Sequence, residues 1–234
     1  MREYQAPLAD MKFVLRELVD WELLTQLPGF GEMTLDVAGA VLDEAAKFAG
    51  ISFEDVIPVY LSFPQQIAAL QNKALDGTLL IEPQATIAVN AGYGVRFLDT
   101  NAFYPHQQIS VIFYSEKFAT ERRDSAQKFM RAWLRGVRTY NDAIAGGKIA
   151  GAGADEVIAT MAKSFSMNAA LVREMYAPAV DVTGAVNAAG IQKDLDFFMR
   201  RGWVTGQIKA DDVIDMSFAR NANAELGPYA HKAP

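Results

Sequence analysis

The 234-residue chain contains no cysteine and only two histidines. Without thiols it cannot form disulfides, thiolate nucleophiles or thiolate metal sites. His231 lies in a polar tail, so His106 is the single useful imidazole, and one imidazole cannot build a histidine metal cluster. The sequence therefore predicts no metal site and no cofactor.

Long apolar runs are also lacking. Charged residues interrupt the N-terminal apolar residues, and no run approaches the roughly 20 residues that span a bilayer. The first residues do not combine a basic segment with a continuous apolar stretch, as a secretory signal does. As written, the sequence predicts a cytoplasmic protein that does not span a membrane.

Catalytic motifs are missing as well. The chain has no G-x-S-x-G, and Gly146-Gly147-Lys148 follows a predicted helix where a phosphate-binding loop would follow a strand. Gly151-Ala152-Gly153 also lacks a preceding strand, so we interpret both segments as linkers. We predict no catalytic residues and no enzyme. The net charge of −6 argues against a nucleic-acid partner.

What is present begins with a helical segment. Between Leu8 and Gly50 the apolar residues recur at intervals of three and four, and Leu27 to Gly31 breaks the pattern. Residues 8–49 therefore read as a helical hairpin that is too small to be stable alone. We expect it to dock on the C-terminal helices.

Residues 50–112 have a different texture, in which short apolar runs alternate with helical spacing. A helix within residues 65–74 has Ser62 as its N-cap and Pro64 in its first turn. A second helix, residues 82–91, ends at Gly92. The predicted strands are 56–61, 78–81, 95–98 and 109–114. This alternation predicts an α/β lobe with a mainly parallel sheet.

Residues 113–234 return to helical spacing, and no repeat of fixed period is present. The predicted helices are 124–145, 155–165, 168–175, 187–201 and 210–226. The aromatic residues of the first of these helices are most simply core residues.

Three loops follow the predicted strands, and ligands of open α/β sheets bind at that edge. The loops are Ser62 to Gln66, Glu82 to Gln84, and Thr100 to Gln108. A helix that begins at Ser62 would direct free N–H groups toward an anion, although Ser62 could equally serve only as a cap. Glu82 likewise has a structural interpretation, since acidic residues are common in the first turn of a helix.

Several blocks resemble the periplasmic substrate-binding proteins of ABC importers, in the nitrate/sulfonate/taurine and thiamine-precursor group. They are "GISFEDVIPVYLSFPQQIAALQNKALDGTLLIEP", "YPHQQISVIFYSEKFA", "SAQKFMRAWLRGVRTYNDA", "LDFFMRRGWV" and "ELGPY", which occur in the same order over about residues 50–230. The resemblance implies part of a type II periplasmic-binding-protein fold, with the α/β lobe at 50–112 and the helical part of the other lobe at 113–234. It also implies a small polar or anionic organic solute and adds an ABC permease as a candidate partner. Such relatives are periplasmic, whereas the first residues of this sequence predict a cytoplasmic protein.

On that interpretation the binding residues fall into three groups. Ser62, Phe63, Gln65 and Gln66 lie at a helix start, Glu82 lies at the cleft edge, and Tyr104 and Gln107 lie on the loop that leads into Ile109.

The first half of lobe one, which precedes such a block in that family, is replaced here by another segment. Tyr4-x-Ala-Pro-Leu, Asp-Met-x-Phe-Val-Leu, Leu-Pro-Gly-Phe and Glu-Ala-Ala-x-Phe-Ala resemble the N-terminal extension of a group of acyl-CoA dehydrogenases. The resemblance covers residues 4–49, places a join near Ala49-Gly50, and carries over neither flavin nor a catalytic carboxylate. Three hypotheses for the function therefore stay open. The chain binds a solute, is an acyl-CoA dehydrogenase-related accessory protein, or is a fusion remnant without ligand.

Overall fold

The computed structural model describes residues 44–45, 47–48, 50, 55–178 and 180–231. Most of the predicted hairpin, residues 8–49, lies outside these residues, so its docking as a whole stays a prediction. Among the described residues, Glu44 accepts a hydrogen bond of 2.6 Å from Lys193 in the C-terminal half. Within the described part, residues 44, 45, 47 and 48 are helical.

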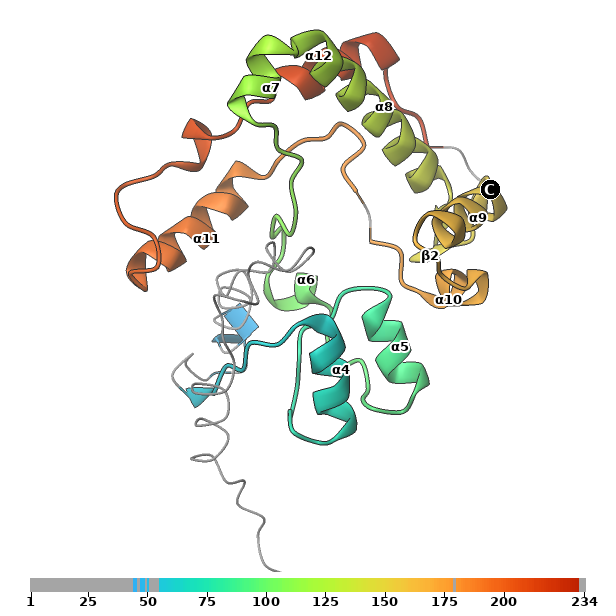
Figure 1. Ribbon diagram of the computed structural model, residues 1–234, viewed down its shortest axis with the longest axis vertical. Helices are drawn as coiled ribbons and strands as arrows, with labels where there is room; N and C mark the ends of the chain where they lie inside the picture. Colours follow the sequence, from blue (N-terminus) through green and yellow to red (C-terminus); the bar gives the residue numbers. More distant parts are fainter. Residues whose placement is uncertain (1–43, 46, 49, 51–54, 179, 232–234) are drawn as a thin grey trace, which may run out of the picture.

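The described chain is mostly helical (Figure 1). Its first helices are α4 (Phe63–Gln71), α5 (Gln84–Asn90) and α6 (Thr100–Phe103). Next come α7 (Glu116–Glu121), α8 (Arg123–Asp142), β1 (Ile144–Ala145), β2 (Lys148–Ile149), α9 (Ala154–Ser164) and α10 (Ala169–Glu174). The last elements are α11 (Ala188–Arg200), the 3-10 helix η2 (Ala210–Asp212) and α12 (Ser217–Leu226).

The residues predicted to begin and end helices agree well with the structure. Helix α4 has Ser62 as its N-cap and a proline in its first turn, where the missing N–H group removes no hydrogen bond. Helix α5 is followed by Gly92, whose φ of 72° suits a residue without a side chain. The exception is the predicted helix 210–226, which is interrupted between η2 and α12.

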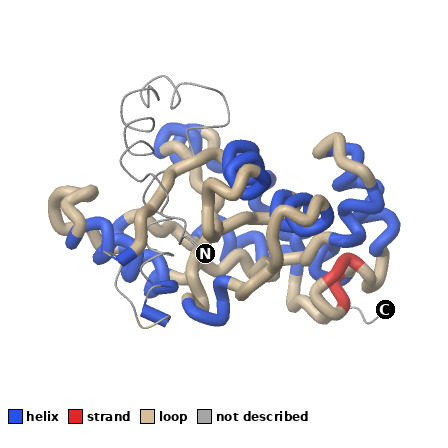
Figure 2. The backbone as a smooth tube through the Cα atoms, turned by 90° about the horizontal axis from the view of Figure 1, so that it is seen from below, coloured by secondary structure: helices blue, strands red, loops and turns tan. Residues whose placement is uncertain are grey.

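The predicted parallel sheet is wrong for the described residues. Their single sheet is the two-stranded β1–β2 hairpin, and none of the four predicted strands belongs to a hydrogen-bonded ladder there (Figure 2). The segments are extended, but a strand forms only with lateral partners, and the described chain provides none. As a result Phe97 is 89% exposed and Phe113 is 80% exposed.

The largest core cluster joins α8 to α12. Ala126, Met130 and Leu134 of α8 pack against Phe218 and the small residues of α12, and Leu134 is fully buried. The aromatic residues of α8 are only partly the expected core, because Phe129 is 48% exposed. Helix α12 thus covers much of the apolar face of α8.

A second cluster surrounds the β1–β2 hairpin, which the sequence analysis treated as a linker. Gly146 and Gly147 form its turn with positive φ angles, and Ile149 packs with α9 and with Val172 of α10. The turn residues therefore position β2 against two helices.

An extended stretch connects the two main parts of the described chain (Figure 1). Helices α4, α5 and α6 form one part, which we call the lower body, whereas α7 to α10 and α12 form the other, the upper body. The chain passes from α6 to α7 through residues 104–115. The two bodies also contact each other directly, through α5 and α10.

Candidate functional site

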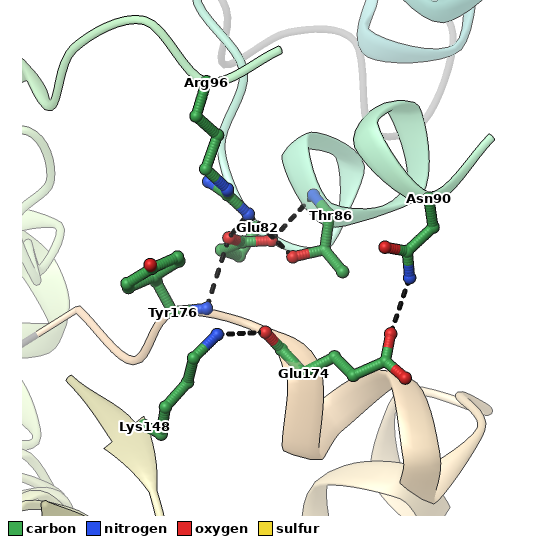
Figure 3. A network of polar contacts seen from close by, with 7 residues as sticks. All are labelled: Glu82, Thr86, Asn90, Arg96, Lys148, Glu174 and Tyr176. Atoms are coloured by element: carbon green, nitrogen blue, oxygen red, sulfur yellow. Dashed lines mark hydrogen bonds and ion pairs between the residues drawn. The ribbon is translucent and has the colours of Figure 1, made fainter. Parts of the chain in front are cut away.

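Glu82 lies where the two bodies meet (Figure 3). It ends the extended segment before α5 and is joined to Pro83 by a cis peptide bond. Its Oε2 atom accepts a hydrogen bond of 3.1 Å from the Thr86 backbone N–H in the first turn of α5. Its Oε1 atom accepts from the Arg96 guanidinium at 2.5 Å and from the Tyr176 backbone N–H at 3.2 Å. One carboxylate therefore joins three separate segments.

These contacts set the charge of Glu82. Burial raises the pKa of its carboxyl group, but hydrogen bonds from Thr86, Arg96 and Tyr176 outweigh burial and bring the pKa below its ordinary value. Glu82 is therefore ionised at neutral pH, when Arg96 is also charged.

Two cations lie against one aromatic ring beside Glu82. The Arg96 guanidinium carbon is 4.8 Å from the centroid of the Tyr176 ring, and the Lys148 Nζ atom is 3.9 Å from it. Tyr176 is 52% exposed, so the ring and its cations can meet a solute. Both distances are typical of a cation–π contact.

A second polar bridge lies next to this ring. Asn90 at the end of α5 donates a hydrogen bond of 2.5 Å to the Glu174 carboxylate of α10. The Glu174 backbone carbonyl in turn accepts from the Lys148 ammonium group (Figure 3). We call Glu82, Asn90, Arg96, Lys148, Glu174 and Tyr176 the junction site.

The polar side chains predicted to bind solute at the start of α4 already form hydrogen bonds within the protein. Gln65 Oε1 accepts from the Ser62 backbone N–H at 2.9 Å and from the Ser62 hydroxyl at 2.7 Å. Gln66 is buried, donates to the Leu61 carbonyl at 2.7 Å and accepts from the Thr78 hydroxyl at 2.7 Å. Gln66 is therefore a structural residue that ties α4 to the extended segment before Glu82.

Tyr104 and Gln107 lie next to α11 and not at the junction site. The Tyr104 hydroxyl donates a hydrogen bond of 2.5 Å to the buried Asp194 carboxylate. Burial raises the pKa of Tyr104, and the charge of Asp194 raises it further. Gln107 Nε2 is buried without a well-formed hydrogen bond to any described residue. The structure thus separates the predicted site residues into three places.

Sequence reasoning missed most of the junction site. Arg96 interrupts the apolar segment 95–98, and a charged residue inside a predicted strand is a signal that could have been noticed. Lys148 was assigned to a linker because its glycines lack a preceding strand. Asn90, Glu174 and Tyr176 have no distinguishing pattern in the sequence, since they come together only through the contact between α5 and α10.

The described residues contain no group of three or more acidic, histidine or cysteine side chains arranged to hold a metal ion. Among the same residues, no helix combines the length and apolar character needed to cross a bilayer.

Comparison with known proteins adds one match. The model of the NMT1-like family, which belongs to the nitrate/sulfonate/taurine-type group of binding proteins, matches residues 39–152. The match includes Glu82, Arg96 and Lys148, and it begins inside the segment 4–49. No comparison supports the resemblance of that segment to acyl-CoA dehydrogenases or a fusion. No curated protein and no solved structure matches the chain.

Proposed function

We propose that this chain binds a small polar or anionic organic solute at the junction site, in the manner of an ABC-importer substrate-binding protein. The observation that carries the proposal is the half-exposed Tyr176 ring with Arg96 and Lys148 against it, at the meeting of the two bodies. The family match over residues 39–152 supports the same class of function.

Hydrogen-bond donors remain available at this site. The Arg96 Nη2 group donates to Glu82 and Thr86, and a guanidinium carries three further N–H donors. Lys148 uses one donor on the Glu174 carbonyl, and an ammonium group carries three. A carboxylate, sulfonate or nitrate group is the natural acceptor for these charged donors. Its organic part would lie on the Tyr176 ring.

The carboxylates of Glu82 and Glu174 offset the two cations, so the site is not strongly positive. This balance favours a polar or singly charged solute over a multiply charged one. We expect weak affinity, in the millimolar range, because part of the donor set is already used in holding the two bodies together.

The test is a titration followed by NMR chemical shifts, with nitrate, a short alkylsulfonate and a short carboxylate as probes. Lys148→Gln should weaken binding about fivefold to tenfold, since a charge-assisted hydrogen bond to a partly exposed group is lost. It should leave the fold intact, because Lys148 does not contact Glu82.

Arg131→Gln is the matched control, since Arg131 pairs with Glu225 on α12, away from this site. It should leave binding unchanged. The proposal is wrong if none of the three probes shifts junction resonances at tens of millimolar, or if both variants weaken binding equally. The first of these outcomes would instead favour a fusion remnant without ligand.

A further inference from the structure

The extended stretch between α6 and α7 exposes a run of large apolar side chains. Ile109, Val111 and Phe113 are 59%, 45% and 80% exposed, and Ile112 between them is 42% exposed. Successive side chains of an extended chain alternate between two faces, so the first three lie on one face. Contiguous exposed apolar residues mark a surface that contacts another molecule. We call residues 108–114 the bridge segment.

Both ends of the bridge segment are held by the rest of the molecule. At its start, the Gln108 Oε1 atom accepts a hydrogen bond of 2.8 Å from the Asn187 backbone N–H. At its end, the Tyr114 hydroxyl donates a hydrogen bond of 2.9 Å to the Ala126 carbonyl, and the Tyr114 ring lies 5.2 Å from the Phe218 ring. Because the segment is anchored at both ends in an extended form, pairing with a partner costs it little further conformational entropy.

The two edges of the bridge segment differ. Alternate residues of an extended chain direct their backbone groups to opposite edges. On one edge, the N–H and C=O groups of Ile109, Val111 and Phe113 have no hydrogen-bond partner among the described residues. On the other edge, the Ser110 carbonyl already accepts a hydrogen bond of 2.7 Å from the Gln108 side chain. One edge is therefore open for strand pairing, whereas the other is partly occupied.

The bridge segment lacks the residues that keep a strand edge from pairing with another chain. Natural edge strands are protected by charged side chains, particularly lysine, or by proline. Residues 107–115, which read QQISVIFYS, contain neither. Two identical segments of this kind meet without like-charge repulsion, so a second copy of the chain needs no complementary charge to pair here.

We propose that two copies of this chain associate through their bridge segments, which pair as antiparallel strands about a two-fold axis at Val111. In this register Ile109 of one copy lies opposite Phe113 of the other, and an aromatic residue is a favourable cross-strand neighbour of a β-branched one. The open backbone groups of Ile109, Val111 and Phe113 form the ladder, which leaves the Ser110 carbonyl with Gln108 as observed. Both copies use the same surface, so the contact closes at a dimer.

The dimer does not depend on the function proposed for the junction site, because no junction residue belongs to the bridge segment. A single pair of short strands is a small interface, so we expect a weak dimer that dissociates on dilution. Sedimentation equilibrium of the full chain, from micromolar to submillimolar concentration, should show a reversible equilibrium between monomer and dimer. A chain that stays monomeric over this range, or that assembles beyond a dimer, would overturn the proposal.

Charge-swap variants at the axis test the register. Val111→Lys and Val111→Glu each place like charges directly opposite one another, so each variant alone should dimerise about tenfold more weakly than the natural chain. An equal mixture of the two should dimerise within about threefold of the natural chain, because opposite charges then meet at the axis.

Val95→Lys is the matched control, since Val95 is 88% exposed on another extended segment. It should leave dimerisation within about twofold, as a surface change away from the contact does. If the mixture stays as weakly associated as its two components, or if Val95→Lys weakens dimerisation as much as Val111→Lys, the proposal is wrong. Rescue by mixing also shows that both variants are folded.

The absence of cysteine allows a direct crosslinking test, since a disulfide of any single-cysteine variant must join two copies. Val111→Cys should crosslink with itself under mild oxidation, because directly opposite residues have Cα atoms within disulfide range. Ile109→Cys and Phe113→Cys should each crosslink poorly alone, since equivalent residues would lie about 14 Å apart along the strands. Mixed together, these two variants should crosslink with each other.

Phe97→Cys is the control for accidental collisions, because Phe97 is 89% exposed and also lies on an extended segment. It should crosslink at least about tenfold more slowly than Val111→Cys, as expected for two residues without a fixed contact. Equal rates for the two variants, or self-crosslinking of Ile109→Cys as fast as that of Val111→Cys, would refute the antiparallel pairing. Cover of the bridge segment by another part of the same chain predicts a monomer with no such crosslink, and that outcome would also refute it.

Discussion

Replacing Glu82 with glutamine tests how firmly the two bodies are held together. The variant keeps the shape of the side chain and one acceptor oxygen, but it removes the charge that Arg96 neutralises. It also places an NH₂ group where one carboxylate oxygen accepts hydrogen bonds now, so contacts on that side are lost.

The magnitude follows from the contacts. The Glu82 side chain is only 11% exposed and accepts charge-assisted hydrogen bonds from Arg96 and from two backbone N–H groups. Such bonds contribute about 1.5–3 kcal/mol each, and Arg96 must be discounted because its side chain is 37% exposed. We expect a total loss of about 2–4 kcal/mol in the free energy of unfolding. For a chain of this size that lowers the Tm by roughly 4–16 °C.

The assay is thermal unfolding of both proteins as a function of pH. The folded pKa of Glu82 lies below its ordinary value of 4.5, so its contribution is complete above that value and is lost as the pH falls through the folded pKa. The Tm difference between the natural chain and Glu82→Gln should therefore be full at pH 7 and shrink below about pH 4.5.

The matched control is Asp155→Asn, because Asp155 also pairs with an arginine, Arg173, at 2.8 Å but is 89% exposed. That change should cost no more than about 0.5 kcal/mol. A Glu82→Gln variant as stable as the control at pH 7 would refute the idea that this carboxylate holds the bodies together. A double-mutant cycle with Arg96→Gln would then show whether the two charges couple at all.

Three further changes test other parts of the structure by the same unfolding measurement. Gln66→Ala should cost about 1–3 kcal/mol, because it leaves the Leu61 carbonyl and the Thr78 hydroxyl without their partner; no loss would mean that water replaces the amide. Leu134→Ala should cost about 2–5 kcal/mol, since it opens a cavity between α8 and α12; a cost under 1 kcal/mol would contradict that packing. Burial raises the pKa of Asp194, so its charged form opposes folding as the pH rises through that pKa. Asp194→Asn should therefore be more stable than the natural chain at pH 7, with the gain disappearing near pH 3.5; a gain independent of pH would exclude this cause.

The helices could be predicted from the sequence because their signals are local. Ser62 followed by Pro64 marks the start of α4, and the three-and-four spacing around Leu134 marks the buried face of α8. These signals depend on residues within one or two turns, so they hold whatever the rest of the chain does. The predicted start of α11 differs from the observed one by a single residue for the same reason.

The sheet could not be predicted in this way, because a strand depends on partners elsewhere in the chain. The runs around Phe97 and Phe113 have the composition of buried strands, yet in the described structure they are extended and exposed. The short β1–β2 hairpin was missed because its strands are two residues long and its glycines look like a linker. Arg96, Lys148 and Tyr176 were missed for a related reason, since their meeting depends on the packing of α5 against α10.

The structural and functional interpretations of Glu82 describe different atoms of one side chain. Its Oε2 atom accepts from the Thr86 N–H group, as an acidic residue at a helix start does. Its Oε1 atom faces the other way, toward Arg96 and the Tyr176 backbone of the other body. Anchoring by α5 fixes the direction of the second oxygen, and that oxygen in turn fixes Arg96 beside the Tyr176 ring. The same carboxylate therefore begins a helix and positions the cation that we propose to bind the solute.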